Sequence, residues 1–257
     1  MSDFTRPSVL VTGGAKRLGG FISRAFGKAG WHVVIHYHTS ENAAEQLALS
    51  LPSAETVRCD LCDDTAAVAM IGELAAQLPD FRALVNCASL FEFDSVTALD
   101  REANRRAMTV NARTPACMAQ AYLAQAKARE GRRVIQVTDQ KIANPNPDFF
   151  SYTMSKHALA ATVPMLAMGS QHANDRVYGL APGAILASHD QDEAETEVSH
   201  RLNLLGRKTA PEEVAEAALF LASGTLASGQ TLFVDSGQHL LNQPRDVIYL
   251  AREGTTA

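Results

Sequence analysis

Short apolar runs alternate with longer stretches of helical periodicity along most of the chain. Parallel strands are joined by crossover helices that cover both faces of their sheet, so this pattern predicts an α/β fold with about seven strands. The runs that predict strands are SVLVTG, WHVVIHYH, ETVRCDL, FRALVNCAS, RRVIQVT, RVYGLAPG and TLFVDSG, which begin at Ser8, Trp31, Glu55, Phe81, Arg132, Arg176 and Thr231.

Helices are expected between these strands, and two further segments lack a clear period. The predicted helices lie before Gly30, at 41–51, at 66–78, from about Leu99 to Lys127, after Tyr152, and from about Pro211 to Ala222. The acidic and polar segment 186–196 is expected to be a mobile flap over a substrate or a plain solvated loop. The other irregular part is a C-terminal tail that starts at about residue 238.

Length and charge narrow the class of protein. The chain has 257 residues, 46% of them hydrophobic and 20% charged, with a formal net charge of −5. This length suits one domain over 1–257. The negative charge and the lack of a basic stripe argue against a nucleic-acid or membrane partner. Since the chain shows no signal-peptide pattern, and Pro164 and Gly169 interrupt its longest uncharged run, we expect a cytoplasmic protein.

The cysteines do not indicate a metal site. Cys59 and Cys62 form a CxxC, but no second pair or pair of histidines follows at zinc spacing, so no metal site is expected.

The stretch TGGAKRLGG, from Thr12 to Gly20, links the first predicted strand to the first predicted helix. Backbone N–H groups at a helix N-terminus bind phosphate, and glycines let the backbone approach a pyrophosphate. The loop therefore indicates a dinucleotide site, with a tight turn that binds no ligand as the alternative. Its side chain at 17 can reach phosphate oxygens or a polar edge of another ligand in the cleft. The expected contacts come from Gly13, Lys16, Arg17, Leu18 and Gly19.

The second predicted strand ends in HYHTS, residues 36–40, and the first carboxylate after it is Glu41. An acidic residue at this place would bind the adenosine 2′-hydroxyl and repel a 2′-phosphate, whereas hydroxyls and imidazoles can donate to a phosphate. NADPH is therefore expected rather than NADH. Two of these residues, the histidines, would share one face of the strand. The expected contacts come from His36, Tyr37, His38, Thr39 and Ser40.

Tyr152 and Lys156 lie four residues apart at a predicted helix start, which places both side chains on one face of the helix. Asp139 ends an apolar strand upstream, and we predict that it shares a pocket with the tyrosine. A carboxylate is an unexpected neighbour for a phenol that must give up a proton, because its charge raises the phenol pKa.

In their order along the chain, these residues resemble the motifs of the short-chain dehydrogenase/reductase family, from Val9 to about Gly237. The motifs are TGxxxRxG at 12–19, Asp60-Leu61, Asn86-Cys87-Ala88-Ser89, Asn111, Tyr152-x-x-x-Lys156, Pro182-Gly183 and Val234-Asp235-Ser236-Gly237. The resemblance implies a single Rossmann-type, doubly wound parallel sheet with helices on both faces.

The resemblance also implies roles for individual residues. Tyr152 would be the proton donor, Lys156 would bind the nicotinamide ribose and lower the tyrosine pKa, and Asn111 would hold a water in the relay. Asp60 would hold the adenine amino group. Further expected cofactor contacts are Leu61, Asn86, Ala88, Ser89, Pro182 and Gly183.

Asp139 stands where most of the family has a serine. Together with KRLG at 16–19, HYHxS at 36–40 and SxF at 89–91, it is similar to the pteridine reductase branch and its dihydromonapterin and dihydrofolate reductase relatives. That likeness implies that Phe91 stacks a pterin against the nicotinamide, that Arg17 and Ser89 hydrogen-bond the substrate, and that Asp139 and Tyr152 act together as the acid. Thr39 replaces an arginine, and Cys87 replaces the second asparagine, of the usual pattern. Glu92 and Asp94 are expected to be solvated.

Three functions stay open at this point. The first is NADPH-dependent reduction of a pterin-type C=N bond, from the dihydro to the tetrahydro form. The second is reduction of another carbonyl or imine, such as a 3-oxoacyl or polyol substrate. The third is a non-catalytic NADP(H)-binding regulator. A homotetramer is expected, because the helices after Asn111 and Tyr152 are apolar on more than one face and must be covered.

Overall fold

A computed structural model describes residues 6–188 and 191–254, and a sheet of seven parallel strands forms its centre. The strand order is β3-β2-β1-β4-β5-β6-β7. The strands are β1 (Ser8–Val11), β2 (His32–Tyr37), β3 (Ala54–Arg58), β4 (Phe81–Asn86), β5 (Arg133–Val137), β6 (Arg176–Pro182) and β7 (Thr231–Val234). The predicted doubly wound parallel sheet is confirmed.

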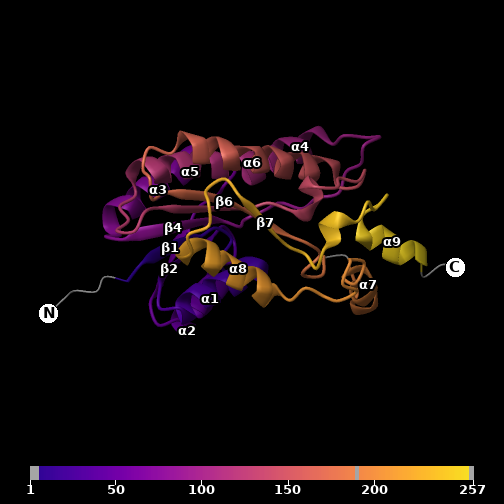
Figure 1. The fold of residues 1–257 in the computed structure, drawn as a ribbon, viewed down its shortest axis with the longest axis horizontal. Coiled ribbons are helices and arrows are strands. Elements are labelled where there is room, and N and C mark those ends of the chain that lie inside the picture. The colour runs from indigo at the N-terminus through magenta and orange to yellow at the C-terminus, as the bar shows by residue number, and fades with distance from the viewer. Residues whose placement is uncertain (1–5, 189–190, 255–257) are drawn as a thin grey trace.

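Helices cover both faces of the sheet, as Figure 1 shows. One layer holds α1 (Arg17–Lys28), α2 (Glu41–Ser50) and α8 (Pro211–Ser223), and the other holds α3 (Asp64–Gln77), α4 (Arg101–Met108), α5 (Thr114–Gln125) and α6 (Phe150–Gly169). Alternate strand residues belong to two separate hydrophobic cores, one on each face of the sheet. Val9 and Val11 pack beneath α1 and α8, while Leu10 packs beneath α3 and α5. Side chains of successive strand residues point to opposite faces, and both faces are covered, which is why most strand positions are apolar.

The sheet places its ligand crevice between β1 and β4. β1 pairs with β2 on one side and with β4 on the other, so the chain winds away in opposite directions from this point. Open α/β sheets bind ligands outside the carboxyl ends of the strands at such a switch point. The connections that follow β1, β4, β5 and β6 therefore build the site.

The predicted helix from about Leu99 to Lys127 contains a turn of different geometry. A π-helical turn, Thr109–Arg113, separates α4 from α5 and contains Asn111. Such turns insert one extra residue into a helix and are frequent at functional sites. No helix in 6–188 or 191–254 combines the length and the apolar character that a bilayer span requires.

Two segments expected to be irregular are partly helical. Within 186–196, where residues 189–190 lie outside the described part of the chain, α7 begins at Glu193 and runs to Ser199. Asp192 caps it, accepting from the N–H of Glu195 at 2.8 Å, while the Glu195 side chain accepts from the N–H of Asp192. The segment is therefore helical from Glu193, where a loop was expected, and a flap over a substrate stays a prediction.

The tail expected from about residue 238 is also structured. It holds a 3₁₀ turn, Gln238–Leu240, and the helix α9, Val247–Gly254. α9 lies beside α7 at one end of the molecule, on the right in Figure 1, and Arg252 pairs with Glu195 of α7 at 2.7 Å. An ion pair with a residue distant in the sequence therefore helps to hold this tail in place.

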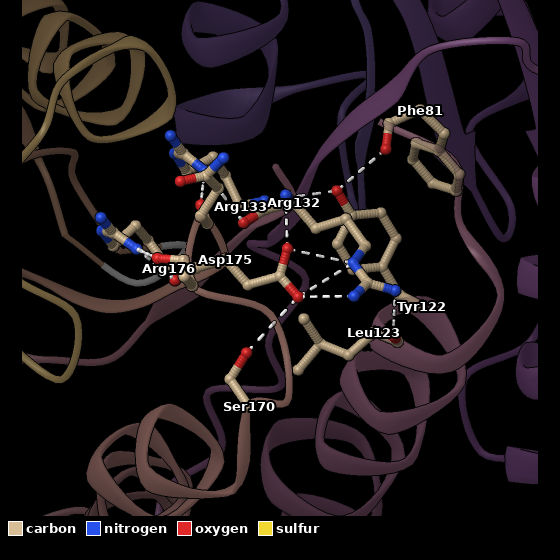
Figure 2. A network of polar contacts seen from close by, with 10 residues as sticks. Phe81, Tyr122, Leu123, Arg132, Arg133, Ser170, Asp175 and Arg176 are labelled. Atoms are coloured by element: carbon tan, nitrogen blue, oxygen red, sulfur yellow. Dashed lines mark hydrogen bonds and ion pairs between the residues drawn. The ribbon is translucent and has the colours of Figure 1, made fainter. Parts of the chain in front are cut away.

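A buried ion pair joins the amino ends of β5 and β6, away from the crevice (Figure 2). Arg132, before β5, donates through Nη2 to Asp175, before β6, at 2.6 Å, and both side chains are buried. The same guanidinium donates to the carbonyl of Leu123 in α5, and Ser170 after α6 donates to Asp175 at 3.4 Å. This network ties two helices to two strands at the end of the sheet remote from the crevice.

Candidate active site

The side chains of Asp139 and Tyr152 meet at the carboxyl end of β5. Tyr152 lies in the first turn of α6, and its hydroxyl donates to Oδ2 of Asp139 at 2.6 Å. The other carboxylate oxygen accepts from the N–H of Lys141 at 2.8 Å. A carboxylate held at both oxygens has one orientation, so the acid and the phenol form a fixed pair.

The pair titrates in a buried environment. Burial, and then the charge of Asp139, raise the pKa of Tyr152 well above its usual value. Burial also raises the pKa of Asp139, against the attraction of Lys141. Burial and the carboxylate therefore oppose the lowering that Lys156 is expected to cause, and that lowering, which also involves the bound nicotinamide, stays a prediction. Tyr152 keeps its proton and shares it with Asp139.

Lys156 is close to the tyrosine but is held by the backbone. Its Nζ donates to the carbonyl of Val137 at 2.8 Å and lies 5.6 Å from the centre of the Tyr152 ring. Burial lowers the pKa of this lysine, and Asp139 opposes the shift. The ammonium thus lies beside the Tyr152 ring, as expected for two residues that share one face of the helix.

Asn111 joins the β4 connection to α6. Its amide oxygen accepts from the N–H of Leu90 at 2.7 Å, and its amide nitrogen donates to the Leu90 carbonyl at 2.9 Å and to Ser155 Oγ at 3.0 Å. The π-helical turn presents this side chain to both segments. A role for Asn111 in proton relay stays a prediction.

A cavity of about 410 Å³ opens beside the acid pair. Its walls include seven of the predicted site residues: Arg17, Leu18, Phe91, Pro182, Gly183 and the Asp139–Tyr152 pair. The Phe91 ring stacks on Phe149 at 4.1 Å and meets the Tyr152 ring edge-on at 4.7 Å. Ser89 lies outside this lining, and its hydroxyl faces the Leu90 carbonyl at 3.4 Å. The volume suits a small ring system.

Arg17 reaches across the mouth of the cavity. Its backbone is in the left-handed region, with φ of 49°, which is uncommon for a residue other than glycine and marks local strain. Its guanidinium donates to the carbonyl of Ala187 at 2.8 Å. The predicted substrate contact therefore also anchors the segment that follows β6.

The loop after β1 fits a pyrophosphate. A Cβ at Gly19 would lie 2.2 Å from the carbonyl oxygen of Gly13, so only glycine lets the loop fold this tightly onto α1. Lys16 caps α1 without a side-chain hydrogen bond to the helix. The hydroxyl of Thr12 accepts from the N–H groups of Cys87 at 2.9 Å and Ala88 at 3.0 Å, which joins the loop to the end of β4. An uncapped helix N-terminus of this kind is suited to an anion.

The residues after β2 fit a 2′-phosphate. β2 ends at Tyr37, whose hydroxyl donates to Glu41 at 2.9 Å and so engages the nearest carboxylate. Beyond it the side chain of His38 is 51% exposed, with Nε2 3.8 Å from Asp60. Thr39 is exposed, and the hydroxyl of Ser40 makes no capping bond to α2.

Two predicted cofactor contacts lie inside the protein instead. His36 is buried, and its ring binds the Gly13 N–H at 3.1 Å and the Cys59 carbonyl at 3.1 Å. His38, which follows the last residue of β2, is exposed instead. The Asn86 amide donates to Gln136 at 2.9 Å and to the Pro115 carbonyl. Both residues support the crevice without lining it.

The other residues expected on the adenosine side differ in exposure. Asp60 is exposed and accepts from the N–H of Cys62 at 2.9 Å, whereas Leu61 is buried. Burial raises the pKa of both CxxC thiols, which therefore lack the activated thiolate of a redox motif.

Asp94 was expected to be solvated and is buried. It accepts from the N–H of Ser151 at 2.8 Å and from the hydroxyl of Ser151 at 2.6 Å, which fixes the start of α6 just before Tyr152. Glu92 pairs with Arg106. A carboxylate that binds a helix N-terminus fits the unsatisfied N–H groups there.

Several cavity residues had no sequence signal. They come from the connection after β5, from α7 and its flanks, and from the C-terminal tail: Gln140, Lys141, Ser188, Gln191, His200, Gln238, Asp246, Val247 and Ile248. None belongs to a motif, and the tail reaches the cavity only through tertiary contacts.

Known proteins share both the sequence pattern and the fold. A family model described as enoyl-(acyl carrier protein) reductase matches residues 13–239. Short-chain dehydrogenase reductase 4 of Arabidopsis thaliana is 34% identical over 244 residues, covering 89% of this chain and 80% of that protein. Pteridine reductase 1 of Leishmania tarentolae is 26% identical over 284 residues, covering 92% and 97%.

Among solved structures, the FolM alternative dihydrofolate reductase 1 of Brucella canis, complexed with NADP, superposes with a TM-score of 0.87 at 31% identity. The match covers 94% of this chain and 97% of that one. The chain belongs to the short-chain dehydrogenase/reductase family. Its fold is that of the NADP-complexed reductase.

Proposed function

We propose that this protein is an NADPH-dependent reductase that transfers hydride to a pterin-type C=N bond, converting a dihydropterin or dihydrofolate to its tetrahydro form. The observation that carries the proposal is the 2.6 Å hydrogen bond from Tyr152 to Asp139 at the wall of the cavity. The likeness to the FolM protein and to pteridine reductase 1 supports the same substrate class.

The chemistry of the acid pair favours nitrogen over oxygen. Reduction of a ketone builds negative charge on oxygen, and that charge needs hydrogen-bond donors. An ionised Asp139 offers only acceptors and would repel an oxyanion. A pterin presents N–H groups that a carboxylate can bind, and the ring nitrogen of its C=N bond must gain a proton. Tyr152 holds a proton that can move to that nitrogen, with Asp139 as its partner.

The crevice offers each part of NADPH a partner of suitable chemistry. The N-terminus of α1 and Lys16 would hold the pyrophosphate, and His38, Thr39 and Ser40 would donate to the 2′-phosphate. Lys156 would bind the nicotinamide ribose. When bound, NADPH supplies the hydride. Asp139, Tyr152 and Lys156 would then orient the substrate and move the proton.

Reduction of another carbonyl or imine is the second candidate, since the family carries many substrates and the acid residue Tyr152 serves both reactions. Phe91 favours the first candidate, because an aromatic ring at the cavity wall can stack on a flat bicyclic substrate. A non-catalytic regulator is the third, and the presence of Asn111, Tyr152 and Lys156 together disfavours it.

The test compares the native protein with Asp139→Ser on dihydrobiopterin, dihydromonapterin, dihydrofolate and an acetoacetyl substrate. We expect the variant to lose at least about tenfold in dihydropterin kcat/KM, while its ketone reduction stays equal or rises. This floor lies below the about 10²–10⁴-fold of a complete acid–base group, because Tyr152 is still present. NADPH binding, followed by fluorescence, should stay unchanged and serves as the control for folding. An unchanged pterin rate in the serine variant would remove Asp139 from the mechanism and favour the ketone candidate.

A further inference from the structure

A second charged pair lines the same cavity and belongs to no motif. Nζ of Lys141 lies 2.6 Å from Oδ2 of Asp246, and both side chains are less than a tenth exposed. Lys141 comes two residues after Asp139, whereas Asp246 arrives from the C-terminal tail. The pair therefore joins the connection that carries the catalytic acid to a segment distant in sequence.

The ammonium of Lys141 is held from several sides. Besides Asp246, it donates to Asn146 Oδ1 at 3.3 Å and to the carbonyl of Asp148 at 3.4 Å, and it lies 5.1 Å from the centre of the Phe149 ring. A buried ion pair often stabilises a fold no better than apolar residues of the same volume, because both charges lose their water. Stability alone is thus a weak reason for this pair to line a cavity.

Asp246 is placed by contacts of its own. Its Oδ1 accepts from the N–H of Ile248 at 3.1 Å, at the start of α9, and its backbone N–H donates to Asp148 at 2.8 Å. Arg245 pairs with the same Asp148 at 2.8 Å. The C-terminal tail is therefore docked so that one carboxylate meets Lys141.

We propose that Lys141 is a positioning residue for the acid pair: its backbone N–H aims the Asp139 carboxylate at Tyr152, and its ammonium, held by Asp246, keeps that carboxylate ionised. The inference deepens the proposed function and uses pterin reduction as one of two readouts. It assigns the C-terminal tail an electrostatic role at the reaction site.

The charges around Asp139 determine the direction in which each substitution should shift its pKa. Burial raises the pKa of Asp139, and the attraction of Lys141 is the largest effect that opposes it. The titratable and charged groups that line the cavity or act on the residues of the acid pair and Lys156 are Arg17 at α1, Cys87 after β4, Lys141 after β5, Tyr152 and Lys156 of α6, His200 after α7 and Asp246 before α9.

Removing the lysine charge should favour the protonated carboxyl, because an opposite charge stabilises the ionised form. Lys141→Met should therefore move the acidic limb of the kcat/KM profile to higher pH. Asp246→Asn leaves the lysine unneutralised and should move that limb to lower pH. Asparagine still caps a helix well, so α9 keeps its start. Lys141→Arg keeps the charge and should restore the native profile.

The experiment measures dihydropterin kcat/KM against pH for the native protein and these three variants. Arg245→Gln is the matched control, because it weakens the docking of the tail to Asp148 without changing the charges of the Lys141–Asp246 pair. It should leave the acidic limb in place. Shifts of opposite sign for Lys141→Met and Asp246→Asn support the proposal. Shifts of the same sign, or an equal shift in Arg245→Gln, overturn it in favour of a purely structural role.

A second readout needs no substrate. Infrared spectra of protein labelled with ¹³C-aspartate follow protonation of Asp139 directly, with the band assigned by its loss in Asp139→Asn. The same opposite shifts should appear in this titration. If pterins are not reduced but the infrared shifts occur, the proposed function fails and the role of Lys141 stands. If Asp139 titrates identically in all variants, the role of Lys141 is wrong whatever the substrate.

Discussion

Lowering the pH should weaken the packing of the glycine-rich loop at 12–20, because one buried histidine that binds this loop becomes protonated. His36 is 2% exposed, and because the Gly13 amide can only donate, its Nδ1 must accept and its Nε2 carries the proton donated to the Cys59 carbonyl. An imidazolium has no acceptor and would break the bond to Gly13. Burial lowers the pKa of His36 to about 4, the Cys59 carbonyl opposes the shift, and the neighbours His38 and Asp60 act in opposite directions.

The size of the effect follows from linkage. The folded pKa lies below the ordinary value of 6.5, so the unfolded chain binds the proton more readily than the folded protein does. The contribution of His36 to stability is present above pH 6.5 and is lost as the pH falls towards about 4. Between about pH 7.5 and pH 5 this one group removes about 2 kcal/mol, since one pKa unit corresponds to about 1.4 kcal/mol.

Equilibrium urea unfolding at both pH values tests the effect. His36→Gln keeps a donor and an acceptor but cannot titrate, so the free energy of unfolding of this variant should fall by about 2 kcal/mol less than that of the native protein. His32→Gln is the control, on the same strand but with its ring bonded to Ser53 and Glu55 nearer the surface. Equal pH dependence in the native protein and His36→Gln would refute the reasoning.

Three further outcomes are expected. Tyr152→Phe should lose about 10²–10⁴-fold in turnover while NADPH affinity stays nearly native, and a fully active variant would point to another proton donor. NADPH should exceed NADH in kcat/KM, because Glu41 is engaged by Tyr37; equal values would mean that Glu41 reaches the ribose. Sedimentation should show a homotetramer, since the side chains of Met165 and Met168 on α6 are exposed in the isolated chain, and a monomer at micromolar concentration would contradict it.

The strands and the reacting residues could be predicted because their signals are local. A buried parallel strand is apolar at most positions, and the tyrosine and lysine four residues apart must share a helix face. Asp139 was predicted to meet Tyr152 because Asp139 lies at the end of a predicted strand and Tyr152 lies at the start of the helix that follows it. Their hydrogen bond confirms the shared pocket.

The remaining site residues depend on contacts that spacing does not encode. His36 was predicted to bind phosphate because residue type alone suggested a donor, whereas the chain turns away after Tyr37 and leaves the imidazole beneath the loop. The tail reached the cavity unpredicted, because Arg245 and Asp246 bind Asp148 across nearly a hundred residues. By contrast, α7 carried a readable signal, since Asp192 and Glu195 have the spacing of a capping box.

The hydrogen bonds that Asp139 already makes limit which substrates the cavity can bind. One carboxylate oxygen binds the N–H of Lys141 and the other binds the hydroxyl of Tyr152. An ionised carboxylate can accept about four hydrogen bonds, so acceptor capacity is left on the side that borders the cavity. A buried acceptor left without a donor costs about 1–3 kcal/mol, and more when it is charged. A substrate that brings N–H groups to Asp139 removes that cost, whereas a carbonyl oxygen adds a second acceptor. In the proposed function, the carboxylate would thereby select for nitrogen heterocycles at the binding step, before any proton is moved.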